Sequence, residues 1–287
     1  MTEEAFIQHA VLMERLLANP AIIIPPYSEV AKSQLDLLAA DGSVNLTCEY
    51  DNPNVPDSVA FYAALGTIYF DSWWYLSTKR FVADFRAAEA NSNIVAHLLY
   101  INSGGGMAYY CDKVAETMQA ATKPVVVICE EIMCSAAYYI ACHATKIFAT
   151  TQFDIIGSIG CKVAYRNLDA YFEKMGLKLI SAYATKSTHK DKLTQELEDG
   201  KPASYVQNIL DPLLAEFEKH VRAGRPAAAA APEDAHVFNG ETYFAPQAQQ
   251  YGLIDGICSF EDALQEAYSL GKAQQNTQKF IYKQFNT

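Results

Sequence analysis

The sequence predicts an α/β protein in which helices cover a mostly parallel sheet. From residue 59 onward, short apolar runs alternate with stretches of helical spacing. Some runs, such as the Val-Val-Val-Ile of residues 125–128, are apolar at every position, as in strands that are buried on both faces of a sheet. With 287 residues, the chain is long enough to bury a full core.

The alternation places the expected elements in order along the chain. We expect strands at 59–68, 94–101 and 124–129, and helices at 81–90 and 109–121. Each of these strands is bounded by turn residues or followed by a helical period. Repeated strand and helix units of this kind are typical of an α/β core.

Beyond residue 145 the same pattern continues. We expect strands at 146–150 and 161–165 and a helix at 168–175. Residues 205–221 again have helical spacing, which Pro212 should interrupt or restart, because proline has no N–H and is tolerated only in the first turn of a helix.

The domain organisation is expected to have three parts. Residues 1–57 are expected to form a helical N-terminal segment and linker, because two short amphipathic stretches precede a polar segment with two prolines at 46–57. Residues 58–270 are expected to form the main domain. Residues 271–287, rich in Gln, Asn and Lys, are expected to form a loosely ordered tail.

Composition narrows the function classes. The formal charge of −11 and the pI near 5.0 disfavour a nucleic-acid partner, since phosphate binding depends on clustered Lys and Arg. No run reaches the roughly 18 apolar residues of a membrane span, and no secretory signal is visible. Seven scattered cysteines have no metal-ligand spacing, and their odd number argues against a full disulfide framework. We therefore expect a cytoplasmic protein.

The most informative segment is 134–141, Cys-Ser-Ala-Ala-Tyr-Tyr-Ile-Ala, where Ser135 stands among small residues just after an apolar run. A serine at a strand-to-helix junction can expose its hydroxyl next to free backbone N–H groups. Cys134 beside it is expected to be a small buried residue and not a rival nucleophile. Trp73-Trp74, Tyr109-Tyr110 and Tyr138-Tyr139 could line an apolar peptide groove, although aromatic pairs more often serve packing or subunit contact.

Hydrolysis by serine needs donors for the developing oxyanion as well as the hydroxyl. Gly105 and Gly106 belong to a Gly-Gly-Gly turn that follows an expected strand, and their N–H groups, with that of Ala136, could form an oxyanion hole. The alternative is a tight turn that needs glycine only for its dihedral angles.

A base is also required, and none of the six histidines stands beside a carboxylate in a triad motif. A lysine can act as the base only if burial lowers its pKa from about 10.4. Taken alone, Lys186, Lys190 and Lys192 would form a solvated basic stretch.

Four motifs of this chain resemble those of the signal peptide peptidase A family of serine–lysine peptidases, over residues from about 59 to 255. Residues 101–106 resemble its Asn-Ser-Pro-Gly-Gly turn, and 134–141 resemble its nucleophile segment. Residues 148–160, which include Gly-Ser-Ile-Gly, and 187–191, Ser-Thr-His-Lys-Asp, resemble its next elements. The resemblance implies a Clp-protease/crotonase-like core of repeated strand-strand-helix units.

The resemblance also implies roles for individual residues. Ser135 would be the nucleophile and Lys190 the general base, with Lys186 as the fallback. Ser158 would hydrogen-bond the lysine amine and hold it toward the serine. The N–H groups of Gly105, Gly106 and Ala136 would bind the oxyanion, and neither a metal nor a cofactor would be needed.

For biology, the Ser-Ala-Ala-Tyr variant resembles phage-type members of the family. It implies a phage or prophage capsid-assembly protease, a homo-oligomer that acts on capsid or scaffold proteins in the host cytoplasm. The alternative within the enzyme class is a soluble peptidase that degrades signal peptides or other peptides. Outside it, the alternatives are a crotonase-like acyl-CoA enzyme and an inactive assembly scaffold.

Overall fold

The computed structural model describes residues 44–50, 55–164, 167–178 and 180–285, together with Glu29 and Lys32. The two helices expected within residues 1–45 therefore fall almost entirely outside the described residues. The chain divides into two compact units. The first comprises residues 1–160 and 217–287, and the second comprises residues 161–216.

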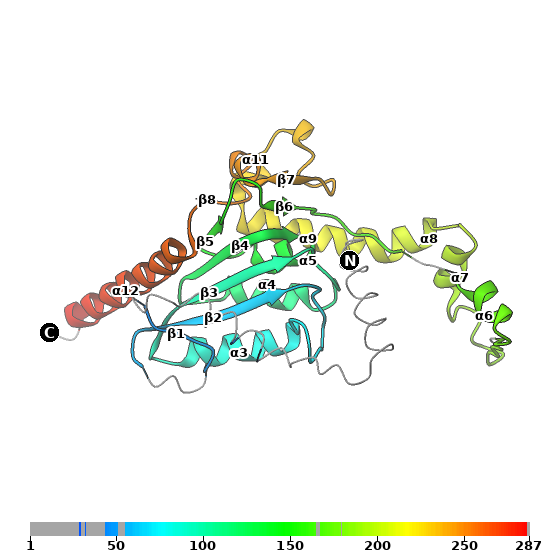
Figure 1. Cartoon of the computed structure of the whole chain (residues 1–287), viewed down its shortest axis with the longest axis horizontal. Coiled ribbons are helices and arrows are strands. Elements are labelled where there is room, and N and C mark those ends of the chain that lie inside the picture. The colour runs from blue at the N-terminus through cyan, green and yellow to red at the C-terminus, as the bar shows by residue number, and fades with distance from the viewer. Residues whose placement is uncertain are drawn as a thin grey trace. The chain divides into compact units, whose positions relative to one another are not determined.

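The first unit is built on a mostly parallel sheet (Figure 1). In the described part of the chain the sheet has eight strands in the order β1-β2-β3-β4-β5-β8, with β6 paired to β4 and β7 paired to β6. The β6–β7 pair is antiparallel, and the other pairs are parallel. The strands are β1 Leu46–Thr47, β2 Ser58–Leu65, β3 Ile94–Ser103, β4 Val125–Cys134, β5 Lys146–Ala149, β6 Ile155–Gly157, β7 Thr242–Phe244 and β8 Gly256–Ile257.

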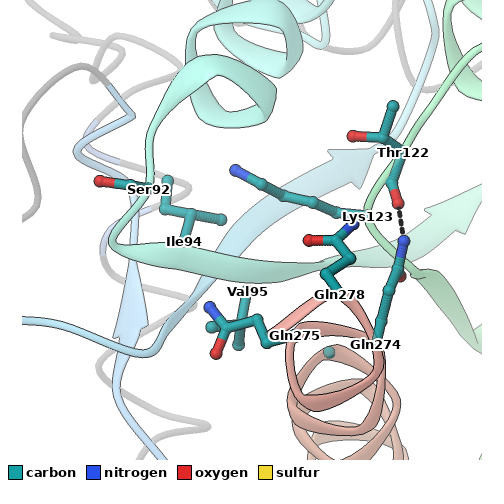
Figure 2. Close-up of a pocket in the computed structure, with 9 residues that line it drawn as sticks. Ser92, Ile94, Val95, Thr122, Lys123, Gln274, Gln275 and Gln278 are labelled. Carbon is teal, nitrogen blue, oxygen red and sulfur yellow. Dashed lines mark hydrogen bonds between the residues drawn. The ribbon is translucent and has the colours of Figure 1, made fainter. Parts of the chain in front are cut away.

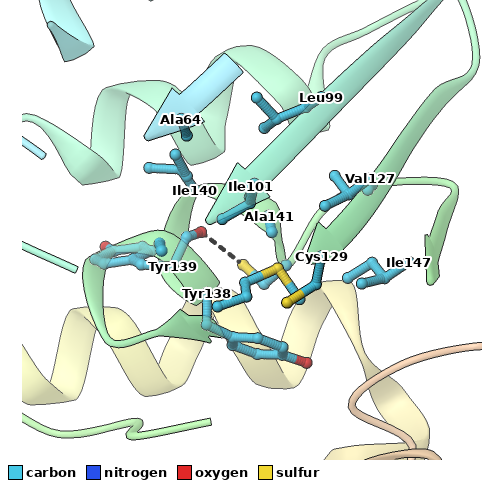
Figure 3. Packing of buried hydrophobic residues seen from close by; sticks show 14 of the residues in the cluster. Ala64, Leu99, Ile101, Val127, Cys129, Tyr138, Tyr139, Ile140, Ala141 and Ile147 are labelled. Atoms are coloured by element: carbon cyan, nitrogen blue, oxygen red, sulfur yellow. Dashed lines mark hydrogen bonds between the residues drawn. The ribbon is translucent and has the colours of Figure 1, made fainter. Parts of the chain in front are cut away.

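Helices cover both faces of this sheet, which confirms the expected α/β class. Along β2, Val59 and Phe61 pack with α12 (Phe260–Phe285), whereas Ala60 and Tyr62 pack in the cluster that includes α3 (Thr78–Ala90), α4 (Cys111–Gln119) and α5 (Ala136–Ala141). Alternate residues of β2 therefore belong to two apolar clusters on opposite faces of the sheet. Figure 3 shows, around Tyr138, part of the cluster to which Ala60 and Tyr62 belong. The helices of this unit are α3 Thr78–Ala90, α4 Cys111–Gln119, α5 Ala136–Ala141, the part of α9 (Asp211–Gly224) from Phe217 onward, α10 Pro226–Ala229, the 3₁₀ helix η2 Glu233–Ala235, α11 Ala245–Gln250 and α12 Phe260–Phe285.

Strand β4 changes its partner halfway along its length. Residues 126–129 pair with β5, and residues 132–134 pair with β6. Between the two pairings Glu131 has a φ of +71°, and the register with β3 shifts in the same region. This irregularity is a β-bulge in a strand that leads directly to Ser135.

The second unit is loosely built. It contains α6 Asp169–Lys174, α7 Lys192–Glu198, α8 Ala203–Tyr205, the π-helix η1 Val206–Leu210 and the start of α9. None of its described residues is buried. The strand expected at 161–165 is wrong for residues 161–164, which have no regular structure and pair with no described strand. Residue 165 lies outside the described residues.

Helix α12 continues as one helix to Phe285, through most of the segment 271–287 that is expected from the sequence to form a tail. Gly271 does not end this helix. A Cβ at Gly271 would lie 2.5 Å from the carbonyl oxygen of Val95, so the glycine allows α12 to approach β3 closely. The residues after it are mostly good helix formers, and they continue the helix.

A histidine pair joins the segment just after α5 to helix α9. His143 Nε2 lies 2.9 Å from His220 Nδ1, and the ring of Tyr139 stacks on Phe217 with centroids 4.5 Å apart. Burial, and then the neighbouring His220, lower the pKa of His143 to about 4. One imidazole of the pair must therefore stay neutral for the contact to persist.

This pair predicts acid sensitivity. His143 binds a proton near pH 6.5 in the unfolded chain but only near pH 4 in the folded chain. The free energy of unfolding therefore keeps its full value above pH 6.5 and decreases as the pH falls toward 4. Because the imidazole is partly exposed, we expect a loss of about 1–2 kcal/mol, measured by urea unfolding at pH 7 and at pH 4.5. His143→Gln should flatten this dependence, and an unchanged slope in that variant would contradict the assignment.

Candidate active site

Ser135 occupies the sharp turn between β4 and α5. It is the N-cap residue of α5 and has φ +55° and ψ −123°, a conformation that residues other than glycine rarely adopt. Its N–H donates to the carbonyl of Gly157 over 2.9 Å, and its own carbonyl accepts from Tyr139 N–H over 2.9 Å. A serine on such a strained strand-to-helix turn presents its hydroxyl as a nucleophile does in serine hydrolases.

The glycine turn after β3 packs directly against this serine. A Cβ at Gly105, whose φ is +102°, would lie 2.8 Å from both Ser135 Cβ and the Cys134 carbonyl oxygen. A Cβ at Gly106 would lie 2.0 Å from the Ile68 carbonyl oxygen. Both positions therefore require glycine for close approach, and Gly105 places the turn beside the serine.

Hydrogen bonding distinguishes the three expected oxyanion donors. Gly105 N–H donates to Ser103 Oγ over 3.1 Å and is therefore already engaged. Among the described residues, no acceptor takes a hydrogen bond from the N–H of Gly106 or of Ala136. The available pair is thus Gly106 and Ala136, while Gly105 serves to bring the turn against Ser135.

Ser103 is a positioning residue that the sequence analysis missed. It is buried, its hydroxyl donates to the Gly66 carbonyl over 2.5 Å, and the same oxygen accepts from Gly105 N–H. It therefore ties the end of β2 to the glycine turn. A serine at the end of a mostly apolar strand, directly before three glycines, was the available signal.

Ser158 follows β6 as Ser135 follows β4. The register pairs Cys134 with Gly157, so the two serines stand at the ends of neighbouring parallel strands. Ser158 also has a positive φ, +51°, and its N–H donates to the Glu241 carbonyl over 2.7 Å. The first unit thus brings together Ser135, Ser158 and the three expected oxyanion residues.

Lys190 belongs to the second unit. It lies in an exposed turn just before α7, where its N–H donates to the Ser187 carbonyl over 3.2 Å. Lys186 is also exposed, and Lys192 forms an ion pair with Glu196 over 3.9 Å. Neither candidate base is buried within its own unit.

Cys134 is buried beside the nucleophile position, as expected. Burial raises the pKa of its thiol to about 12, so the thiol stays protonated at neutral pH. Its sulfur lies 3.7 Å from the carbonyl oxygen of Ile155, to which the thiol donates. It therefore serves packing and is not a rival nucleophile.

Some of the aromatic pairs are packed in the core, and others are exposed as a peptide groove would require. Tyr138 and Tyr139 are buried and pack in the core (Figure 3). By contrast, Trp73 is 57% exposed and Tyr109 is 61% exposed, on loops that leave β2 and β3 next to the glycine turn. The two loops meet where the rings of Phe70 and Tyr109 pack edge to face, 4.9 Å apart. Exposed aromatic side chains therefore lie on the two loops that follow β2 and β3.

A pocket of about 220 Å³ lies elsewhere, between the amino ends of β3 and β4 and helix α12 (Figure 2). Gln274 donates there to the carbonyl of Thr122, and Lys123 Nζ donates to the carbonyls of Ala88 and Asn91. Because Ser135 follows the other end of β4, this pocket is not part of the candidate active site.

Among the described residues, no group of three His, Cys, Asp or Glu side chains is arranged to hold a metal ion. No helix in the same part of the chain combines the length and the apolar character of a membrane span.

These features define a class: an α/β protein with a strained serine at the end of a parallel strand and two backbone donors beside it. The Peptidase family S49 model matches residues 117–274, more than half of the chain, and the chain belongs to that family. The Clp protease model matches residues 75–157, which cover β3, β4 and the serine turn, and supports the Clp/crotonase-like fold.

Curated relatives agree with this family. The chain is similar to a candidate protease of Methanocaldococcus jannaschii, with 27% identity over 63% of this chain and 58% of the relative. It is similar to a candidate signal peptide peptidase of Enterococcus faecium, with 26% identity over 65% of this chain and 54% of the relative. It is also similar to Protease 4 of Haemophilus influenzae, with 26% identity over 67% of this chain and 31% of the relative.

The chain thus spans between about a third and three fifths of the length of these relatives. Among solved structures, a ClpP1 mutant of Listeria monocytogenes has a TM-score of 0.42 and 13% identity, over 71% of this chain and 94% of that chain. The assignment of fold and family therefore rests on the two family models and not on the likeness to the ClpP1 structure.

Proposed function

We propose that the chain is a serine endopeptidase that hydrolyses peptide bonds through an acyl-enzyme, with Ser135 as the nucleophile and Lys190 as the general base. The observation that carries the proposal is the strained Ser135 turn packed against Gly105, with the N–H groups of Gly106 and Ala136 available beside it. Membership in a peptidase family supports the same chemistry.

In the proposed reaction, Ser135 Oγ bonds to the scissile carbonyl carbon while Lys190 Nζ takes the hydroxyl proton. The N–H groups of Gly106 and Ala136 stabilise the oxyanion. The C–N bond then breaks, and the lysine passes the proton to the leaving amine. Water hydrolyses the resulting ester and regenerates Ser135, and Ser158 holds the lysine amine toward the nucleophile.

The base must be neutral to accept a proton, which requires a drier environment than an exposed turn. The second unit carries many exposed apolar side chains, including Met175 at 60% and Ile180 at 85% exposure. Association with further copies of the chain would bury such a surface, and we include a homo-oligomer in the proposal. Bound substrate and neighbouring subunits would then exclude water from Lys190.

The substrate is proposed to be a peptide or protein, and the exposed Trp73 and Tyr109 beside the glycine turn offer apolar contacts for its side chains. The Ser-Ala-Ala-Tyr segment favours a phage or prophage enzyme that matures capsid or scaffold proteins. The relative from Enterococcus faecium, named as a signal peptide peptidase, favours the second candidate, a soluble enzyme that degrades signal peptides.

Peptide hydrolysis tests this proposal. Wild-type protein should cleave casein or a fluorogenic peptide library, and Ser135→Ala should lower kcat by about 10³-fold or more, because no other group replaces the nucleophile. Cys134→Ala is the matched control and should retain activity, since its buried thiol is protonated. Equal activity in wild type and Ser135→Ala would overturn the proposal. A folded wild type that cleaves nothing but binds coenzyme A would support an acyl-CoA enzyme instead.

A further inference from the structure

Asp154 is a buried carboxylate that lies outside the residues assigned to the reaction. It is 3% exposed and stands between β5 and β6, one residue before β6 begins. Burying a carboxylate is costly unless hydrogen bonds replace its lost hydration. Its surroundings therefore need an explanation.

The carboxylate is satisfied by five hydrogen bonds from neutral donors. Oδ2 accepts from the N–H and hydroxyl of Thr150, over 2.7 and 2.9 Å, and from Thr151 N–H over 3.0 Å. Oδ1 accepts from the Thr151 hydroxyl over 2.9 Å and from Glu131 N–H over 3.1 Å. Four of the five bonds fix the turn after β5, and the fifth reaches a different strand.

That fifth bond falls at the bulge of β4. Glu131, with its φ of +71°, lies between the residues of β4 that pair with β5 and those that pair with β6. Asp154 therefore joins three strands at the point where β4 changes its partner. The pairing of Ile132 with Ile155 begins immediately after this bond.

The pairing that follows ends at the candidate active site. Three residues along β4 lead from the bulge to Ser135, and three residues of β6 lead from Asp154 to Ser158. The Ser135 N–H bond to the Gly157 carbonyl, 2.9 Å long, closes this short ladder. A slip of the ladder at its start would displace both serines at its end.

We propose that Asp154 is a positioning residue for Ser135, which it holds in its reactive turn by fixing the register between β4 and β6. This inference rests on the proposed nucleophilic role of Ser135. Asp154 touches neither the hydroxyl nor the oxyanion donors, so it acts through the strands alone. An amide at this position would place an NH₂ group against N–H and O–H donors, and at least one of the five bonds would be lost.

The test compares Asp154→Asn with Asp255→Asn. Asp255 also accepts a backbone hydrogen bond, from Ile147 N–H over 2.8 Å, and it forms an ion pair with Arg225 over 2.9 Å. It lies at the other end of β5 from Asp154. We expect Asp154→Asn to lower the rate of reaction of Ser135 with a fluorophosphonate about tenfold or more per folded molecule, and to lower kcat with KM within about twofold. Asp255→Asn should lose stability and keep the wild-type labelling rate.

Hydrogen exchange of the Ser135 amide supplies a readout that needs no activity. Asp154→Asn should increase its exchange rate, and Asp255→Asn should not. If Asp154→Asn does not fold, Thr151→Val, which removes one hydroxyl donor, should show a smaller change in the same direction. Wild-type labelling and exchange in a folded Asp154→Asn variant would overturn the inference. A wild type that never labels would overturn the proposed function, and the exchange comparison would still decide the positioning role.

Discussion

Lys190→Ala is expected to lower kcat by about 10³- to 10⁴-fold with KM nearly unchanged, because a general base acts in the transition state and not in substrate binding. The measurement is steady-state hydrolysis of the best peptide found for the wild type. Lys186→Ala is the control from the same turn region, and its kcat should stay within about twofold. The opposite result for the two lysines would move the base to Lys186.

Lys190→Arg adds a second check of the same role. It keeps the positive charge and much of the side-chain length, but a guanidinium does not give up its proton in this pH range. The arginine variant should therefore be as inactive as the alanine variant. An active Lys190→Arg enzyme would show that the residue contributes charge alone.

Gly105→Ala is expected to reduce kcat/KM by about 10²-fold or more. Its Cβ would lie 2.8 Å from Ser135 Cβ and from the Cys134 carbonyl oxygen, so the glycine turn or the serine must move. A displacement of about 1 Å at a reacting group is enough for a loss of this size. The measurement is kcat/KM together with thermal unfolding.

Gly176→Ala is the control that separates the steric clash expected in Gly105→Ala from the cost of a positive φ alone. Gly176 also has a positive φ, +80°, yet a Cβ there would meet nothing within 4 Å. It should cost about 1–2 kcal/mol of local strain and leave kcat/KM unchanged. An equal loss of activity in both variants would contradict close packing of the glycine turn on Ser135.

The sequence predicts the central sheet well because the relevant signal is local. The apolar run at 125–128 and the alternating helical periods mark β4 and its neighbours without any knowledge of their partners. The serine turn is equally visible, since small residues directly follow the strand. The N–H groups beside Ser135 become distinguishable only when partners such as Ser103 are known.

Features that depend on distant partners are not visible in the sequence. Asp154 looks like an ordinary turn residue until Glu131, on another strand, is placed beside it. The segment at 161–164 is expected as part of a strand but pairs with no strand among the described residues. Gly271 is the first residue of the expected tail, but it lies in a close helix–strand contact. In each case a tertiary contact decides the structure.

The most direct test of the account is to map the adduct that a fluorophosphonate forms on the folded wild-type protein. After digestion, peptide mass spectrometry should find one modified residue, Ser135, and Ser135→Ala should carry no adduct. Labelling should fall strongly in Lys190→Ala, because the serine would lack its base. An adduct on a different residue, or none on a folded and oligomeric sample, would contradict the assignment of Ser135 as the nucleophile.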